Sequence, residues 1–222
     1  MKFIFPELSS PILFEEDAVP SLVVENAGLF RRLLEDIYAQ QNGVDGFSVL
    51  SENDTPISIA KYLDLTLSFV PFELNRKSLL NKILSSLEKM AQNETFFLKT
   101  QELLSHAENY MDDLSFEQSC ELEFDKLSVS SLFKAFGVRI YEEEQTTLFK
   151  VLTYMELVRE YDRDKLFVLV NLRDYFEDKE VETFLQSALS HKFRILLLDS
   201  HEHSKLSCEK RRILDADLCE ID

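Results

Sequence analysis

Asp199 is the first candidate for chemistry, because it directly follows the apolar run 195–198. Nucleotide hydrolases hold magnesium with an acid at the end of a buried strand, but they also need a loop that cradles phosphate. None of the 4 glycines is followed in register by the lysine and hydroxyl residue of that loop. We therefore expect Asp199 to end a core strand, with a degenerate nucleotide hydrolase as the alternative.

Glu177 and Lys179, with Asp174 upstream, have the carboxylate and lysine spacing of a metal-dependent nuclease. The chain contains 41 acidic residues, so such a cluster also arises by chance. Acidic residues before Val181 suit the first turn of a helix, where they face the positive end of the helix dipole. We expect the helix N-terminus and keep the nuclease as the alternative.

The histidines offer a metal or acid-base site only if a partner is near. His201 and His203 are separated by one residue, and the other two are His106 and His191. Imidazoles at i and i+2 point to opposite faces of a strand, whereas a loop can place them anywhere. We expect a surface loop without a ligand. No nucleophile elbow or cysteine and histidine signature is found, which predicts a non-catalytic protein.

An acidic stretch offers ligands for a hard cation. If this stretch is extended, Leu122 and Phe124 face the core, and the opposite side carries three carboxylates, those of Glu121, Glu123 and Asp125. Convergent carboxylates suit calcium, which takes six to eight oxygens, and they repel one another without it. A solvated acidic ridge is the alternative, because no EF-hand loop surrounds them.

The net charge of -17 opposes binding to nucleic acid, since affinity for DNA comes chiefly from cations that neutralise phosphates. A diffuse basic surface is excluded. Several cations nevertheless lie close together in the middle of the chain or at its borders, so they can line one surface: Arg76, Lys77, Lys82, Lys126 and Lys134. Solvated helix faces are the alternative for these residues.

The first third of the chain predicts short strands and one helix. Prolines punctuate the first runs and suggest edge-like strands at 3–5, 12–14 and 22–24. Apolar residues at helical spacing predict a helix over 29–38, with Asn26 as its N-cap and Gly43 beyond its end. Two further strands are expected at 47–50 and 62–69, and Pro71 closes the second of them.

The middle of the chain is helical in pattern. After Asn75, a candidate N-cap, the apolar stripe from Leu79 to Met90 predicts a helix. A second helix is expected over about 94–111, and a third over 129–136, which ends at Gly137. Residues 75–137 are therefore predicted to be an all-helical insertion.

The last third alternates between strand and helix. Strands are predicted at 138–141, 166–170 and 195–198, and helices at 148–158 and 181–189. Continuous apolar strands joined by helices usually pair in parallel and are buried on both faces. The fold class is thus α/β with a mainly parallel sheet, in which residues 1–74 and 138–222 form one domain around the insertion.

Composition and termini indicate the class and compartment. With 222 residues, 45% hydrophobic and 29% charged, the chain is expected to be globular. Residues 1–8 lack the apolar core of a signal peptide, and no apolar run is long enough to span a membrane. The three cysteines lack CxxC spacing, which argues against disulfides and zinc knuckles. We expect a cytoplasmic protein.

The order of four segments resembles a known family. They are residues 1–12, FELNRKSLLNKIL (72–84), ELEFDKLSVSSLFKAFGVRI (121–140) and TLFKVLTYMELVREYDRDKLFVLVNLRDYF (147–176). In order, spacing and total length they are similar to the DNA-end-binding adaptation protein of type II-A CRISPR systems. None of these motifs is catalytic.

The resemblance implies an α/β head related to phosphate-loop folds but without the catalytic loop, and an inserted helical leg. It implies a homotetrameric ring that binds calcium and threads linear double-stranded DNA during spacer acquisition in a prokaryote. It also implies two protein partners, the adaptation integrase and the effector nuclease. A ring resolves the charge conflict, because an acidic exterior can surround a positive bore that contacts phosphates without reading bases.

The resemblance also bears on the candidate sites. Glu121, Glu123 and Asp125 fall in a stretch similar to the calcium-binding region of the family, which favours the metal interpretation. The five basic candidates are assigned to the bore by their charge and by their place in the insertion, not by a matched motif.

Overall fold

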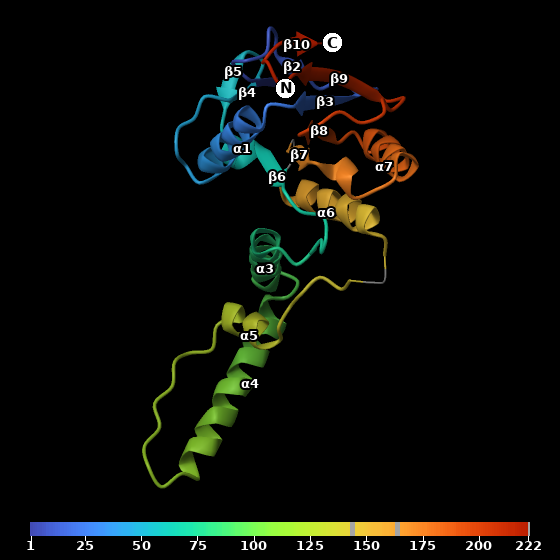
Figure 1. Ribbon diagram of the computed structural model, residues 1–222. Coiled ribbons are helices and arrows are strands. Elements are labelled where there is room, and N and C mark those ends of the chain that lie inside the picture. Colours follow the sequence, from blue (N-terminus) through green and yellow to red (C-terminus); the bar gives the residue numbers. More distant parts are fainter. Residues whose placement is uncertain (143–144, 163–164, 222) are drawn as a thin grey trace. The chain divides into compact units, whose positions relative to one another are not determined.

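The computed structural model describes residues 1–142, 145–162 and 165–221. The chain divides into two compact units, one formed by residues 1–73 and 144–222 and the other by residues 74–143. The first unit combines helices and strands, so the predicted α/β class is confirmed (Figure 1). Among the described residues, no helix has the length and apolar character needed to cross a membrane.

A six-stranded sheet organises the first unit, with the strand order β10-β9-β3-β8-β7-β6. The pairings from β9 to β6 are parallel, and β10 pairs antiparallel with β9. The strands are β3 (Val19–Val24), β6 (Leu63–Thr66), β7 (Leu166–Val170), β8 (Arg194–Asp199), β9 (Glu209–Leu214) and β10 (Glu220–Ile221).

Four short strands make a second, antiparallel sheet with the order β2-β1-β4-β5. These strands are β1 (Lys2–Ile4), β2 (Ile12–Leu13), β4 (Val49–Glu52) and β5 (Thr55–Ile57). One face of the large sheet shares a core with this sheet and with helix α1 (Ala27–Gln41). Val168 and Leu196 line that face, and Leu33 of α1 packs against it. The short helix α2 (Ile59–Tyr62) leads directly into β6.

The opposite face of the large sheet packs against α6 (Thr147–Tyr161) and α7 (Asp178–Ser190), the helices that precede and follow β7 (Figure 1). Side chains alternate between the two faces of a strand, so Phe167 and Leu197 point away from the core around α1. The chain between β8 and β9 has no helix, although these strands are parallel to β3 between them. Residues 200–208 therefore return along the sheet as a loop.

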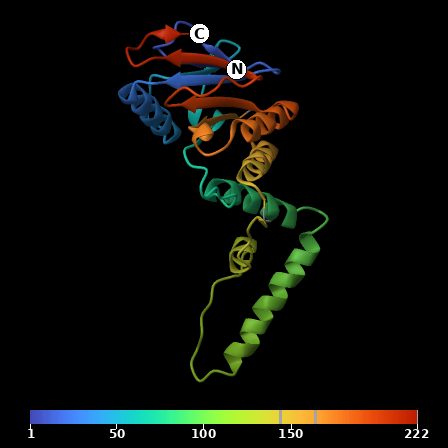
Figure 2. The same cartoon turned by 45° about the vertical axis from the view of Figure 1, so that its right-hand side comes forward.

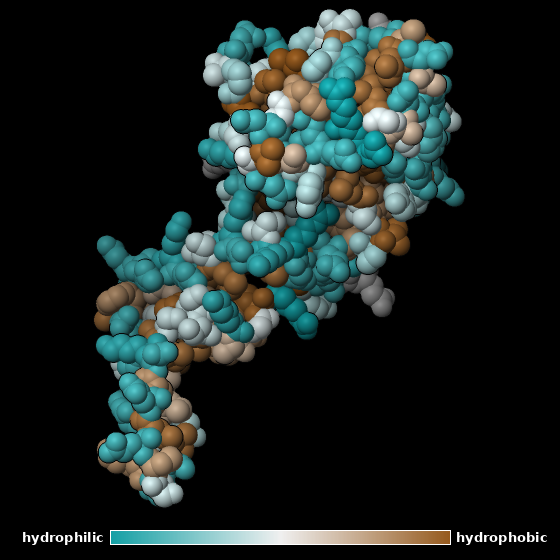
Figure 3. Space-filling model, turned by 60° about the vertical axis from the view of Figure 1, so that its left-hand side comes forward, coloured by the Kyte–Doolittle hydropathy of each residue, from teal (hydrophilic) through white to brown (hydrophobic). Residues whose placement is uncertain are grey.

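The second unit consists of α3 (Lys77–Ala91), α4 (Phe97–Phe116) and α5 (Val129–Ala135), with residues 117–128 outside helix and strand (Figure 2). Helix α5 ends at Ala135 with Phe136 as its C-cap, and the next residue, Gly137, has a φ of 61°, a conformation that favours glycine. Helix α4 has no fully buried residue. Brown, apolar side chains are visible on the surface of this unit in the lower part of Figure 3.

Two predicted elements differ in the structure because of the contacts of Asn75. The predicted strand over 138–141 is wrong, since these residues form neither helix nor strand. The Asn75 side chain donates to the carbonyl of Ile140 (3.1 Å) and accepts from its N–H (2.7 Å). Asn75 is also not the N-cap of α3, a position that Arg76 occupies. A side-chain amide thus supplies the backbone hydrogen bonds that a neighbouring strand would have supplied.

The predicted edge position of the strand at Leu22 is wrong, because β3 lies in the middle of the sheet. Proline is tolerated there for a geometric reason. The N–H of Val19 donates to Cys208 on the β9 side (2.8 Å), and successive residues alternate sides. The nitrogen of Pro20 therefore faces β8, whose pairing with β3 begins only at Ser21. No ladder hydrogen bond is lost.

Candidate functional site

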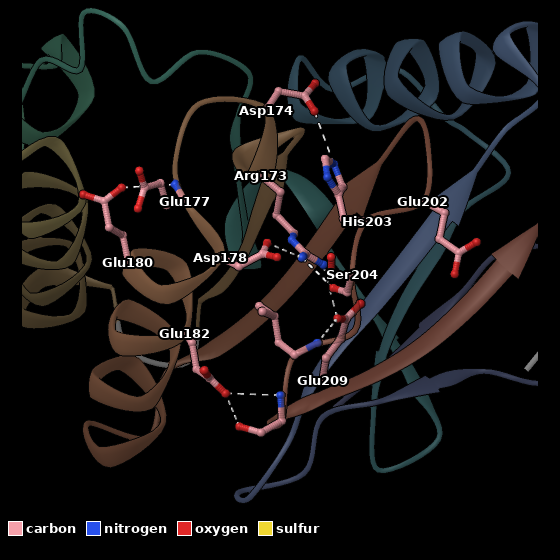
Figure 4. Close-up of polar contacts among 12 residues, drawn as sticks. Arg173, Asp174, Glu177, Asp178, Glu180, Glu182, Glu202, His203, Ser204 and Glu209 are labelled. Carbon is pink, nitrogen blue, oxygen red and sulfur yellow. Dashed lines mark hydrogen bonds and ion pairs between the residues drawn. The ribbon is translucent and has the colours of Figure 1, made fainter.

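A buried polar cluster lies on the face of the sheet that carries the loop 200–208. At its centre is Arg173, in a short 3-10 turn (Leu172–Asp174) that follows β7, with only 1% of its side chain exposed. The guanidinium donates to Asp178 (2.6 Å), to the carbonyl of Ser204 (2.6 Å) and to Glu209 (3.4 Å) (Figure 4). One side chain thereby connects β7, α7, the loop and β9.

Glu209 is the second buried member of the cluster. It receives Arg211 Nε at 2.7 Å, a second Arg211 nitrogen at 2.8 Å and the N–H of Leu206 at 3.0 Å. Burial alone would raise the pKa of Glu209, but these hydrogen bonds outweigh it and hold the pKa below its usual value. The carboxylate is therefore charged and balanced by two guanidinium groups.

Asp199, at the end of β8, is buried without the hydrogen bonds that Glu209 accepts. It is 1% exposed, and its Oδ1 atom has no hydrogen-bond partner. Burial raises the pKa of Asp199 to about 7, although the positive charge of Arg173 acts in the opposite direction. The predicted role of Asp199 as the end of a core strand is confirmed, and its burial makes it a poor ligand for a substrate-bound metal.

Asp174, His201 and His203 meet at the carboxyl ends of β7 and β8. The Nε2 atoms of both imidazoles lie 3.2 Å from the same oxygen, Asp174 Oδ1. The imidazole rings lie side by side, with centroids 4.4 Å apart. The expected surface loop is confirmed, but the expectation that its histidines have no partner is wrong.

The two chain turns that carry this trio are fastened to each other. Asn171 follows β7 in the left-handed conformation, with φ of 51°. Its N–H donates to Leu198 at 2.9 Å, and its side-chain oxygen accepts from the N–H of Ser200 at 2.8 Å. Carboxyl ends of neighbouring parallel strands are the usual ligand-binding edge of an open α/β sheet. The fold places the three side chains at such an edge.

The trio differs in exposure. Asp174 and His201 are exposed, with 54% of the His201 side chain accessible, whereas His203 is partly covered, with 19% of its side chain exposed. Burial lowers the pKa of His203, and the nearby charge of Arg173 lowers it further. His203 is therefore neutral at pH 7 and retains a lone pair.

All five basic residues proposed for DNA lie in the second unit. Arg76 precedes α3, Lys77 and Lys82 lie on α3, Lys126 is on the segment after α4, and Lys134 is on α5. Lys77, Lys126 and Lys134 are exposed, while Arg76 and Lys82 are half-buried.

The three acidic candidates for calcium, Glu121, Glu123 and Asp125, lie on an exposed segment outside helix and strand. Leu122 and Phe124 are 49% and 41% exposed, so the expectation that they face the core is wrong. The segment has no neighbouring strand to bury them.

Of the nuclease candidates, Asp174 belongs to the trio, whereas Glu177 and Lys179 do not. Glu177 is the N-cap of α7 and forms a capping box with Glu180, which confirms the helix N-terminus. Lys179 lines a different, apolar hollow between α6 and α7. In the described parts of the chain, only Asp174, His201 and His203 form a group of three potential metal ligands. The residues proposed for a nuclease therefore do not converge.

Sequence reasoning missed the buried arginine network and β9. Residues 209–214 read EKRRIL, which looks solvated, because only Ile213 and Leu214 are apolar. Glu209, its first residue, is instead buried in ion pairs with Arg173 from the turn after β7 and with Arg211 of the same strand. If residues 209–214 are read as extended, Glu209, Arg211 and Ile213 lie on one face. This spacing was the available signal for a strand.

Comparisons with known proteins agree with one another. The family model described as "CRISPR-associated protein (Cas_Csn2)" matches residues 40–218. A relative from Enterococcus faecalis, "CRISPR-associated protein Csn2", is 22% identical over 90% of this chain and 90% of its own length. A relative of the same name from Streptococcus agalactiae is 23% identical over 82% of this chain and 80% of its own length.

A solved structure has the same fold. The protein described as "Crystal structure of Stu0660 of Streptococcus thermophilus" superposes with a TM-score of 0.60 at 15% identity. The match covers 97% of this chain and 74% of the other. It extends over both units.

Asp199→Asn tests the cost of the unpaired carboxyl group. Because the folded-state pKa is raised from 3.8 to about 7, the folded protein binds more protons than the unfolded chain between these values. Stability therefore falls as the pH rises through this window and then levels off. We expect the variant to lose this pH dependence and to be more stable than the original protein at pH 8, by about 2 kcal/mol. Urea unfolding with a chelator at pH 5 and pH 8 measures both effects.

Asp36→Asn is the matched control. Asp36 is also buried, but it accepts hydrogen bonds from Phe47 N–H (2.9 Å), Ser48 N–H (3.0 Å) and Gln40 (3.0 Å). This variant should lose about 1–3 kcal/mol at both pH values. Equal destabilisation by Asp199→Asn at both pH values would contradict the assignment of an unpaired carboxyl group.

Proposed function

The chain belongs to the CRISPR-associated Csn2 family of type II-A adaptation proteins, and from this premise we propose that it binds the ends of linear double-stranded DNA during spacer acquisition. In this proposal, four copies form a calcium-stabilised ring that encloses the duplex without reading its sequence. The protein itself is non-catalytic. It delivers the DNA to the adaptation integrase and acts alongside the effector nuclease.

The observation that carries the proposal is the charge of residues 76–91. This stretch holds four basic residues and one acidic residue, within a chain whose net charge is -17. The acidic residue is Glu88, and the basic ones are Arg76, Lys77, Lys82 and Lys89. A local excess of cations attracts phosphates at short range, while the acidic remainder disfavours other approaches. Copies of α3 arranged around an axis would make one positive bore.

Self-assembly is supported by the apolar surface of α4. Phe97, Leu104 and Met111 follow one another at seven-residue spacing, and so do Phe96, Leu103 and Tyr110. This spacing is typical of helices that pack against a second helix over several turns. Most of these side chains are exposed in the single chain. We propose that other copies of the chain cover them, because exposed apolar surface of this extent is unusual on a monomer.

Calcium has a defined place in this proposal. Glu121, Glu123 and Asp125 are exposed on a segment with no regular hydrogen bonding of its own, so they can rearrange around an ion. Binding would offset the repulsion among the carboxylates and order the segment. Leu122 and Phe124 would then be held in one position for contact with another copy.

The wider architecture also belongs to the proposal. The parallel sheet of the first unit is the head, related to phosphate-loop folds, and residues 75–137 are the helical leg. The turn after β3 supports a head that does not bind triphosphate. In this turn Asn26 accepts from the N–H of Leu29 and donates to the carbonyl of Ala216. Side-chain and backbone groups thus occupy the start of α1, where a phosphate loop would present free N–H groups.

Lys77→Glu/Lys134→Glu tests the DNA surface. We expect affinity for a linear duplex with calcium present to fall at least about tenfold, and its salt dependence to weaken by about 0.9 in slope for each phosphate that is no longer neutralised. Lys205→Glu/Lys210→Glu, two exposed positions in the first unit, makes the same change in net charge and should have little effect. Gel-shift titrations at several salt concentrations measure both. Equal losses in the two variants would mean that only net charge matters.

The ring itself is tested with the same duplex in linear and closed circular form. A protein that threads DNA should retain the linear form and spare the circle. Equal retention of both forms would rule out threading. Incubation with magnesium or manganese in the same assay would reveal cleavage, the outcome expected of the nuclease alternative.

Leu103→Glu/Tyr110→Glu tests the assembly surface. These two side chains are exposed, so the single chain should still fold, but charges at this position should prevent copies from packing. We expect the mass in solution to fall from a tetramer to a smaller species, as measured by light scattering. Ser105→Glu/Asn109→Glu, on neighbouring exposed positions of α4, is the control and should leave the mass unchanged. A tetramer in both variants would place the interface elsewhere.

Glu123→Ala/Asp125→Ala tests the calcium ligands. We expect about tenfold more calcium to be needed for assembly or for DNA retention, because two oxygen ligands are removed. Asp112→Ala/Asp113→Ala removes the same charge from α4 and is the control. A calcium titration that is unchanged by the first variant would show that calcium binds at another place.

A further inference from the structure

The trio Asp174, His201 and His203 has the donor atoms and spacing of a transition-metal site. Two ligands that each lie about 2.1 Å from a tetrahedral ion are about 3.4 Å apart. The observed separations from Asp174 Oδ1 to the two Nε2 atoms are both 3.2 Å. One ligand atom from each of the three side chains lies within 4.8 Å of the others. An ion can thus be accommodated with small side-chain rotations.

One potential metal-ligand atom of the trio, His203 Nε2, has no hydrogen-bond partner. His203 Nε2 is buried and makes no hydrogen bond, although it lies at ion-pair distance from Asp174 Oδ1. A buried nitrogen without a hydrogen bond is unfavourable unless another partner is present. A metal ion bound between the imidazoles and the carboxylate would supply that partner.

The charge of the surroundings also favours a cation. Five carboxyl groups and two guanidinium groups lie in or beside the cluster: Asp174, Asp178, Asp199, Glu202, Glu209, Arg173 and Arg211. Arg173 is engaged by Asp178 and Glu209, so its charge is largely balanced. The Asp174 carboxylate faces the two imidazoles rather than either guanidinium. A divalent ion complements the negative charge of this carboxylate.

We propose that Asp174, His201 and His203 bind a divalent transition-metal ion, of which zinc is the representative. Two imidazoles and one carboxylate are a ligand set used for zinc and other late first-row metals, whereas calcium prefers oxygen alone. The three protein ligands leave a position for water on the side where His201 is exposed. The ion fastens the turn after β7 to the loop after β8. The three ligands belong to the first unit, whereas the residues proposed for calcium and for DNA belong to the second.

The alternative without metal is an ion pair between Asp174 and protonated imidazoles. This alternative predicts no metal binding and a contact that strengthens only as the histidines are protonated. The two interpretations therefore differ in a direct binding measurement at pH 7.5.

Metal is first removed from the full chain with a chelator. Zinc is then titrated at pH 7.5, and its binding is measured by calorimetry. We expect one zinc ion per chain. Cobalt in place of zinc should give visible absorption bands of a four-coordinate ion, and excess calcium should not displace it. His201→Ala is the main variant because this side chain is exposed and its removal leaves the core intact. We expect its zinc affinity to fall at least about tenfold. Asp174→Asn should act in the same direction.

His191→Ala is the matched control. Its Nε2 atom lies 3.3 Å from Glu156, so it forms a histidine and carboxylate contact of similar length, but without a second imidazole. Zinc affinity should be unchanged in this variant. The proposal is overturned if the original chain binds no zinc, or if His201→Ala and Asp174→Asn bind it as tightly as the original chain does. DNA retention by the zinc-free protein is measured in parallel, so loss of zinc binding is distinguishable from loss of DNA binding.

Discussion

The buried guanidinium of Arg173 is the interaction on which the arrangement of the first unit depends. Strand β9 lies beyond β3, so the chain must return over the sheet between β8 and β9 without a helix to satisfy its backbone. Arg173 reaches the carbonyl of Ser204 in this loop, Asp178 at the start of α7 and Glu209 at the start of β9. Removal of one partner would leave a charge uncompensated in the interior, which typically costs about 3–5 kcal/mol. Polar contacts thus replace the apolar packing of a crossover helix.

The same network contains two carboxyl groups whose pKa values are shifted in opposite directions. Glu209 is held ionised by direct hydrogen bonds, whereas Asp199 is buried without a partner for Oδ1, which raises its pKa to about 7. Two carboxyl groups near the same arginines therefore behave differently, because hydrogen bonds stabilise a charge at short range and burial penalises it everywhere. Asp174 is different again, since it faces two imidazoles at the carboxyl edge of the sheet. That edge is where this fold class usually places its ligands.

The second unit, unlike the first, leaves most of the apolar side chains of its longest helix exposed. Its longest helix, α4, buries no residue completely, and residues 117–128 form neither helix nor strand. A unit with so much exposed apolar surface gains stability when other chains cover it. In the proposed function, assembly and DNA binding are linked, because a chain with net charge -17 would hold a polyanion only where its cations outnumber its acids locally. Residues 76–91 are such a place.

The sequence by itself determined the elements whose hydrophobic pattern is local. The helix capped by Asn26, the apolar strands at 166–170 and 195–198, and the acidic start of α7 are all present as predicted. Their signals are spacing and capping, which depend on neighbours only a few residues away. The resemblance in segment order likewise identified the family from the sequence.

Only the tertiary structure decided how distant residues meet. Asn75 bonds to Ile140 rather than capping α3, β3 is central despite Pro20, and Glu209 of the polar β9 is paired with Arg173 from the turn after β7. His201 and His203 face the same carboxylate because a loop, not a strand, carries them past Asp174. Such contacts join residues that are 27 to 65 positions apart, and a pattern read over one turn or one strand contains no information about them.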